Sequence, residues 1–405
     1  MSRPLIIISR NPASYLSGHS IFAWQLSEFL GGRAQVPVVH ITHTTDEGPR
    51  HSVDITPPVS TPLYRRIEVE YEAMEKVPHS LSSCSVADAV DAVLQENPEG
   101  VCGVLAISPL SYLADVVNVC LPSRTPVVSL LRGTDTLVLT QLWGSTAAGQ
   151  RYRRALDACN GIYTVSHWLL DLAVELDIPV TGVVAPVTFH PFASETFDAD
   201  AEELIKGLFP RSNNAGQKLV IFAGRMAAEK GALKVANVID KLLNLDSSFL
   251  AVMAGSGPER SKVEQVLAAH AANGRAWVGA LTFPRVLALA TRTDLMVMGS
   301  GLEEGTNFTE AISSSTVTFA ALGTPVLFGA GPRSGGIAEA VGNENLRWCE
   351  SLPDVESWPE AIAALFQDGP RRERIATENR TAGKAFEIHK VLAQLMTIFE
   401  IKLPG

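Results

Sequence analysis

Charged residues and paired cysteines are scarce in this chain. Only 19% of its 405 residues are charged, and the formal net charge is −10. Binding to the phosphates of nucleic acid requires a basic surface that displaces counterions, so this balance argues against a nucleic-acid partner. The net negative charge also disfavours binding to a strongly anionic membrane surface. The five cysteines form no CxxC pair, a pattern typical of buried thiols in a reducing compartment.

Long apolar runs are also missing. No stretch reaches the roughly 18 apolar residues that mark a membrane-spanning helix. The run Leu5–Ile8 is much shorter than the apolar core of a secretion signal, and Arg10, Asn11 and Pro12 end it. The sequence therefore predicts a cytoplasmic protein without a transmembrane segment.

Several familiar catalytic patterns are absent as well. The nine histidines form no HxxxH pair, and no set of His, Cys and carboxylate residues has metal-ligand spacing. There is no P-loop, no GxGxxG fingerprint and no convincing Ser-His-Asp order. These absences weigh against nucleoside-triphosphate hydrolysis and NAD chemistry, and we expect neither a metal nor a bound cofactor.

Short apolar segments rich in β-branched residues alternate with longer amphipathic segments. This alternation predicts an α/β protein with parallel sheets and crossover helices. Strands are predicted at Leu5–Ser9, Val36–Ile41, Val101–Ile107, Pro126–Leu131, Gly161–Val165 and Val180–Val184, and again at Leu219–Ala223, Phe249–Ala254, Ala276–Val278, Leu295–Val297 and Pro325–Phe328. The pattern restarts at Leu219, which indicates two Rossmann-like domains whose strand ends face an interdomain cleft.

The domain boundaries follow from composition. We predict an N-terminal domain over residues 1–197, a polar, turn-rich linker over 198–216 and a C-terminal domain over 217–380. One long terminal helix is expected at Arg371–Phe399, and its end, within 381–405, can pack back on the N-terminal domain.

The clearest local signal is a buried strand that ends in Gly224-Arg225 and is followed by Lys230-Gly231 and a helix. An Arg and a Lys at a strand end can bind a diphosphate without a metal, because Arg supplies a fork of donors and Lys a point charge. The alternative is that both side chains only solvate a loop.

Four motifs in order resemble the C-terminal domain of retaining glycosyltransferases of the glycogen-synthase-like family, which have the GT-B fold. They are Gly224-Arg225-x4-Lys230-Gly231, Ala254-Gly255-Ser256-Gly257-Pro258-Glu259, Val278-Gly279 and Leu322-Gly323-Thr324-Pro325-Val326. The resemblance covers roughly residues 215–345 well and the N-terminal half weakly. It implies that the C-terminal domain binds a nucleotide sugar and that the N-terminal domain is the acceptor side.

The resemblance implies roles for three of these residues. Arg225 and Lys230 would neutralise the diphosphate as it leaves the anomeric carbon, where charge grows in the transition state. Gly279 would allow the nucleotide base to approach the backbone. The Gly255-Ser256-Gly257 turn is better explained by close packing of strand and helix.

The family pattern of two glutamates eight residues apart is broken here. In one register Glu310 contacts the donor sugar and Thr318 stands where the ribose-binding carboxylate is expected. In the other, Glu304 lies by the sugar and Glu310 takes the ribose role. Asn307 and Thr309 can donate hydrogen bonds in either register. A solvated loop followed by an acidic first helical turn is the structural alternative.

The N-terminal half supplies three further donor-binding candidates. Gly18 and His19 stand at the start of the first helix, where backbone N–H groups can face an anion. Arg132 follows the strand Pro126–Leu131 at a position where relatives commonly have His, and Arg cannot accept a hydrogen bond.

The sequence thus predicts a metal-independent hexosyltransferase that moves a sugar from a nucleotide sugar to an unidentified acceptor with retention. A homodimer is left open. Two alternatives stand beside it: a sugar-nucleotide epimerase or phosphorylase on the same fold, and a non-catalytic nucleotide-binding or accessory protein with a degenerate site.

Overall fold

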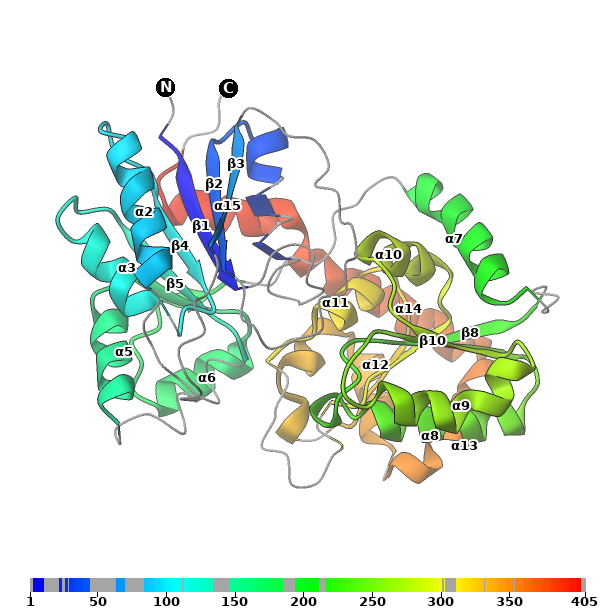
Figure 1. Ribbon diagram of the computed structural model, residues 1–405. Helices are drawn as coiled ribbons and strands as arrows, with labels where there is room; N and C mark the ends of the chain where they lie inside the picture. The colour runs from blue at the N-terminus through cyan, green and yellow to red at the C-terminus, as the bar shows by residue number, and fades with distance from the viewer. Residues whose placement is uncertain are drawn as a thin grey trace. The chain divides into compact units, whose positions relative to one another are not determined.

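The computed structural model describes most of the chain. The described residues are 3–10, 22–23, 26–27, 29–43, 63–69, 84–110, 112–133, 146–184, 194–210, 216–300, 302, 311–330, 332–352 and 354–401. The chain forms two compact units (Figure 1). Unit 1 comprises Met1–Thr188 with Ile388–Gly405, and unit 2 comprises Phe189–Glu387.

Unit 1 is built on a parallel sheet in the order β3-β2-β1-β4-β5-β6-β7, the order of a Rossmann-like sheet. Its strands are β1 (Leu5–Arg10), β2 (Val38–His43), β3 (Tyr64–Val69), β4 (Gly103–Ile107), β5 (Val127–Leu131), β6 (Gly161–Thr164) and β7 (Gly182–Val183). The central strands β4 and β5 are buried throughout, as expected for strands covered on both faces.

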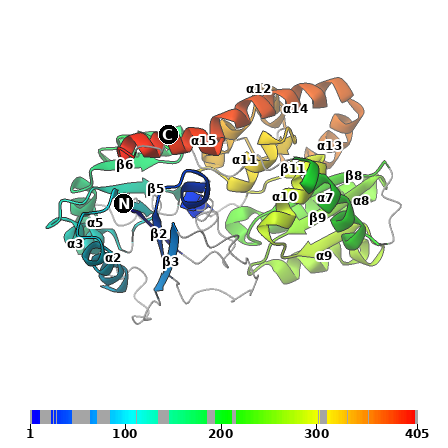
Figure 2. The ribbon, with the colours of Figure 1, turned by 90° about the horizontal axis from the view of Figure 1, so that it is seen from above.

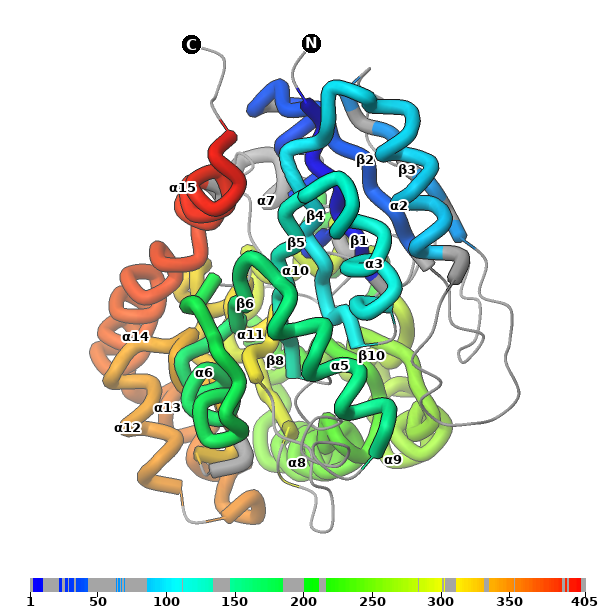
Figure 3. The backbone as a smooth tube through the Cα atoms, turned by 90° about the vertical axis from the view of Figure 1, so that its left-hand side faces the viewer, coloured from blue at the N-terminus to red at the C-terminus, as the bar shows by residue number. Residues whose placement is uncertain are grey.

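Helices cover both faces of this sheet. They are η1 (Phe29–Arg33), α2 (Cys84–Glu96), α3 (Leu113–Cys120), α5 (Ala147–Asp157), α6 (His167–Glu175) and the C-terminal α15 (Ile388–Ile398). The helices α2, α3 and α5 lie in a row along one face (Figure 3), and α15 lies on the other (Figure 2).

Unit 2 repeats the architecture with a smaller parallel sheet in the order β10-β9-β8-β11-β12. Its strands are β8 (Lys218–Ala223), β9 (Phe249–Ala254), β10 (Ala276–Gly279), β11 (Leu295–Val297) and β12 (Val326–Leu327). The two parallel sheets with crossover helices confirm the predicted α/β class.

The helices of unit 2 also form two layers. They are α7 (Ser194–Leu208), η2 (Ala228–Lys230), α8 (Ala232–Leu245), α9 (Arg260–Ala272), α10 (Phe283–Arg292), α11 (Ser314–Ala321), η3 (Pro332–Ala340), α12 (Asn343–Glu350), η4 (Val355–Ser357), α13 (Trp358–Gln367), α14 (Gly369–Gly383) and η5 (Lys384–Phe386). In Figure 1, α8, α9 and α13 lie below the sheet, and α10 and α11 lie above it.

The predicted linker differs from the structure. Residues 198–208 belong to α7 rather than to a run of turns. Ala201 and Ile205 are buried at helical spacing, so this acidic segment forms an amphipathic helix. The division between the units falls at Thr188 and Phe189, before α7.

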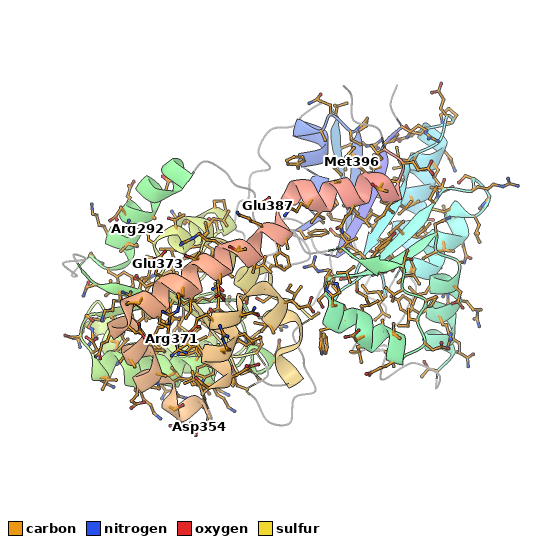
Figure 4. The ribbon with its side chains drawn as sticks, turned by 180° about the vertical axis from the view of Figure 1, so that it is seen from behind. Arg292, Asp354, Arg371, Glu373, Glu387 and Met396 are labelled. Atoms are coloured by element: carbon orange, nitrogen blue, oxygen red, sulfur yellow. The ribbon has the colours of Figure 1, made fainter. Side chains whose placement is uncertain are left out.

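The prediction of a single long helix at Arg371–Phe399 is also wrong. This segment divides into α14, η5 and α15, with Glu387 in extended conformation before α15 (Figure 4). At Gly383 a Cβ would lie 2.4 Å from the Cα of Ala321, so α14 ends on a glycine that packs against α11.

Candidate functional site

The site of unit 2 is indicated by its strand order. A doubly wound parallel sheet binds ligands outside the carboxyl ends of its strands, where the order of strands reverses. In unit 2 this switch point lies between β8 and β11, which are neighbours in the sheet. The segments that leave these two strands contain Arg225 and Lys230 on one side and Gly299 on the other.

Backbone contacts hold the segment after β8 against the segment after β9. Gly224 N donates to Ala254 O at 3.0 Å, and Met226 N donates to Ser256 O at 2.8 Å, which extends the ladder beyond both strands. A Cβ at Gly255 would lie 1.9 Å from the carbonyl oxygen of Gly224. Close packing of the backbone is therefore enough to explain the Gly255-Ser256-Gly257 turn, and no ligand contact is needed for it.

Arg225 and Lys230 are both in the connection between β8 and α8. The Arg225 side chain is 66% exposed and its Nη1 is 3.3 Å from Oε1 of Glu229. Lys230 is half-buried and ends the single turn of η2. An exposed ion pair of this kind is weak, so the guanidinium can leave Glu229 for a stronger anion.

The N-terminus of α8 follows directly after Lys230. Its N-cap is Gly231 in the left-handed conformation with φ of 59°, and no described side chain caps the helix. The first backbone N–H groups of a helix have no intrahelical acceptor and carry partial positive charge. Arg225, Lys230 and this helix end are therefore three sources of positive potential in one short connection, which suits a diphosphate.

Gly279 ends β10 at the same edge of the sheet. Its carbonyl accepts a hydrogen bond from Gly255 N at 2.7 Å, so the ends of β8, β9 and β10 lie in one row. A Cβ at Gly279 would lie 2.8 Å from the ring of Trp277. Packing within the strand is therefore enough to explain a glycine at this position, and its contact with a nucleotide base stays a prediction.

Thr318 lies in α11 with its side chain turned toward its own helix. It is 2% exposed, and its hydroxyl donates to the carbonyl of Ser314 at 2.9 Å. This geometry gives no support to the register that places Thr318 at a ribose.

Arg132 belongs to unit 1 and is buried after β5. It is 3% exposed, and its guanidinium carbon lies 5.0 Å from the centre of the Phe22 ring, a cation–π contact. The remaining predicted residues lie outside the described residues. They are Gly18, His19, Glu304, Asn307, Thr309 and Glu310.

Unit 1 has its own switch point, between β1 and β4. The hydroxyl of buried Tyr112 donates to the Ile107 carbonyl at 2.7 Å and lies 3.2 Å from the Ile8 carbonyl. Nearby, Ser9 Oγ and His40 Nε2, both buried, are 2.9 Å apart. Tyr112 thus links β1 and β4 at the switch point of unit 1.

Among the described residues, no three His, Cys, Asp or Glu side chains are grouped closely enough to hold a metal ion. A search of the same residues for a helix with the length and apolarity needed to cross a bilayer finds none. A hollow of about 540 Å³ in unit 2 lies along β10 and is lined by Trp277, Glu264 and Leu208 among others. It is not lined by Arg225 or Lys230.

Sequence comparison connects unit 2 to a known family. Residues 208–382 match the family model described as Glycosyl transferases group 1. A 2-deoxystreptamine glucosyltransferase of Streptomyces kanamyceticus is 29% identical over 217 residues, 53% of this chain and 51% of that protein. The putative teichuronic acid biosynthesis glycosyltransferase TuaC of Bacillus subtilis (strain 168) is 26% identical over 223 residues, 54% of this chain and 53% of that protein. Each match thus spans about half the length of the relative.

Structural comparison covers both units. A glycosyltransferase from Rickettsia africae ESF-5 superposes with a TM-score of 0.68 over 98% of each chain, at 14% identity. Anabaena Alr3699/HepE in complex with UDP superposes with a TM-score of 0.65 over 98% of this chain and 99% of that one, at 13% identity. The whole chain therefore has the two-domain GT-B fold of these structures, and residues 208–382 match the group 1 family model.

Proposed function

We propose that this chain transfers a hexosyl group from a nucleotide sugar to an acceptor, with retention of the anomeric configuration and without a metal. Unit 2 binds the nucleotide sugar, and Arg225 and Lys230 stabilise the departing diphosphate. Glu304 and Glu310, in one of the two registers, face the donor sugar and the ribose, with Asn307 and Thr309 as hydrogen-bond donors. The acceptor remains to be identified.

The observation that carries the proposal is the connection between β8 and α8 at the switch point of unit 2. It contains Arg225 and Lys230 and ends at a helix N-terminus that no described side chain caps. Negative charge grows on the diphosphate as the glycosidic bond breaks, so fixed positive groups stabilise the transition state more than the bound substrate. No proton has to move for this stabilisation.

The comparisons agree with a sugar-transfer reaction of this kind. The group 1 match covers the whole β8–α8 connection, and the two relatives are described as glycosyltransferases. The HepE structure contains UDP, which makes UDP and UDP-sugars the first probes to use on this chain.

The test is to replace the two cations separately. Arg225→Ala and Lys230→Ala should each lower turnover by roughly 100-fold or more, the scale for removing one preorganised group that stabilises charge. Arg260→Ala is the matched control, because Arg260 is also exposed and pairs with Glu264 four residues later, as Arg225 pairs with Glu229. Release of nucleoside diphosphate is measured over a panel of nucleotide sugars and acceptors, with EDTA in one arm.

Rates that stay unchanged in Arg225→Ala and Lys230→Ala would overturn the assigned role. The two alternatives give different products. An epimerase changes the nucleotide sugar without any acceptor, and a phosphorylase needs inorganic phosphate. A non-catalytic protein would bind UDP in titration calorimetry and turn over no donor with any acceptor.

A further inference from the structure

Lys234 occupies an unfavourable position in the first turn of α8. The partial positive charge at a helix N-terminus favours acidic side chains and disfavours a lysine. The Lys234 ammonium, however, donates a hydrogen bond to the backbone carbonyl of Leu302, which lies 68 residues further along the chain. A hydrogen bond from a charged donor is stronger than a neutral one and can offset the cost of the position.

The carbonyl that Lys234 binds belongs to the segment that leaves β11, here called the β11 exit and defined as Gly299, Ser300 and Leu302. Leu302 N donates to Gly299 O at 3.1 Å. Ser300 is buried, and Leu302 is half-buried. The β11 exit is therefore folded back on itself, with one carbonyl presented to α8.

Two glycine contacts hold the same segment. A Cβ at Gly231 would lie 2.1 Å from the carbonyl oxygen of Gly299, so the N-cap of α8 touches the β11 exit directly. A Cβ at Gly329, just after β12, would lie 2.8 Å from Cδ2 of Leu302. Of these three contacts with the β11 exit, only the one from Lys234 is made by a polar side chain. Its partner is the carbonyl of Leu302, the residue that directly precedes positions 303–310.

We propose that Lys234 is a positioning residue of the donor site. Its ammonium fixes the Leu302 carbonyl and thereby the course of the β11 exit, which contacts the N-cap of α8 directly after Lys230. The inference rests on the proposed function for its consequence in catalysis, but the contact itself lies within unit 2 and is independent of that function. Lys234 differs from Arg225 in that its partner is a backbone carbonyl, whereas Arg225 pairs with the Glu229 carboxylate.

The experiment compares Lys234→Met with Lys241→Met. Lys241 lies in the same helix, and its ammonium pairs with Glu356 at the surface, so the control removes an equal charge away from the β11 exit. Amide hydrogen exchange is followed by mass spectrometry in peptides that cover residues 296–302, without substrate. Lys234→Met should speed exchange of the Leu302 amide by roughly tenfold, the scale of one hydrogen bond to a charged group. Lys241→Met should leave it unchanged.

A second readout is kinetic. Lys234→Met should lower kcat by roughly tenfold with a smaller change in KM for the donor, and its melting temperature should stay close to that of Lys241→Met. Lys234→Arg keeps the cation and should restore both the exchange rate and kcat in large part. It also keeps the test decisive if the methionine variant folds poorly.

The outcomes separate the two proposals. Unchanged exchange at Leu302 in Lys234→Met would overturn the positioning role whatever the protein catalyses. Faster exchange with full turnover would overturn the link between the β11 exit and the donor site. A wild-type protein that turns over no nucleotide sugar would refute the proposed function and leave the exchange result intact.

Discussion

Glycine is required at position 231 for two separate reasons. Its φ of 59° is in the left-handed region, and a Cβ there would meet the Gly299 carbonyl at 2.1 Å. An L-residue in this conformation costs about 1–2 kcal/mol, and the clash adds strain because the obstacle is backbone. The connection that contains Arg225 and Lys230 can therefore pack against the β11 exit only if position 231 is a glycine.

Gly231→Ala should lower the free energy of unfolding by about 2–5 kcal/mol, the sum of these two effects. Gly207→Ala is the contrasting variant, because Gly207 lies in α7 with nothing within 4 Å of a Cβ. It should raise the free energy of unfolding by about 0.5–1 kcal/mol through helix propensity. Urea unfolding measures the change in the free energy of unfolding for each variant. Equal changes would contradict a close contact between residue 231 and the Gly299 carbonyl.

Asp294 should make the free energy of unfolding depend on pH, and the direction follows from the shift of its pKa. Its burial raises the pKa of the carboxyl group, although Leu219 N donates to Oδ2 at 2.8 Å and nearby cations act in the opposite direction. The unfolded chain loses this proton at a pKa of about 3.9, so stability falls as the pH rises through the higher pKa of folded Asp294.

Asp294→Asn should therefore be more stable than the wild type at pH 7, and its advantage should shrink toward pH 4. Asp246 provides the opposite case, because hydrogen bonds from Ser248 hold the pKa of the Asp246 carboxyl below its usual value. Asp246→Asn should lose stability at pH 7, and the loss should shrink in acid. The Asp246 effect is lost only below the unfolded pKa of about 3.9, so chemical unfolding from about pH 2 to about pH 7 tests both variants. Parallel curves for the two variants would contradict the assignment.

Elements with buried apolar sequences are readily predicted, whereas those shaped by distant contacts are not. Phe249–Ala254 and Leu295–Val297 are predicted with their observed bounds because every residue in them is buried. The strand β3 is missed, since half of the residues in Tyr64–Val69 are charged. It lies at the sheet edge, where Arg65 pairs with Glu96. The break after α14 is missed because Gly383 packs on a helix far away in sequence.

The same distinction applies to the candidate site, where local sequence patterns can be recognised and contacts between distant residues cannot. Arg225 and Lys230 can be named as candidates from the sequence because a buried strand and a helix bracket them within a few residues, and their role stays a prediction. Lys234 cannot be named in this way, since its partner is a backbone carbonyl 68 residues away. A lysine in the first helical turn was the available signal, and it opposes the helix dipole.

The free edge of β12 shows how side chains can complete an element. Asn345 donates to the Val326 carbonyl at 2.6 Å and accepts from Val326 N at 2.8 Å, so its amide pairs with β12 as another strand would. Asn379 donates to Thr324 O at 2.9 Å and to Asn345 Oδ1 at 3.0 Å. Both amides are buried, and their satisfied hydrogen bonds fix α12 and α14 at the sheet edge.

The two units differ in how the chain builds them. Unit 2 is one continuous segment, Phe189–Glu387, and contains the whole of the group 1 match at 208–382. Unit 1 needs both ends of the chain, because α15 and the residues after it belong to it. The four motifs that the sequence displays in order all fall in unit 2, so the sequence supports a proposal for the diphosphate site and none for the acceptor.

Removing the C-terminal segment should therefore damage unit 1 and spare unit 2. Val391, Leu395 and Phe399 are buried, and the Phe399 ring lies 2.7 Å from where a Cβ of Gly103 would stand, at the start of β4. Burial of such side chains contributes about 1.5–3 kcal/mol each, so a chain ending at Glu387 loses several kcal/mol from unit 1 alone.

Calorimetry of the chain that ends at Glu387 should show an early transition for unit 1 and a later one for unit 2. Addition of UDP should raise only the later transition, because a ligand stabilises the unit that binds it. Limited proteolysis with mass spectrometry identifies the two, with early cleavage expected in Met1–Thr188 and a protected core in Phe189–Glu387. Full-length Phe399→Ala should shift the early transition by a smaller amount. A single transition that moves as a whole with UDP would mean that the two units unfold together in the truncated chain, and it would contradict a separate loss of stability in unit 1.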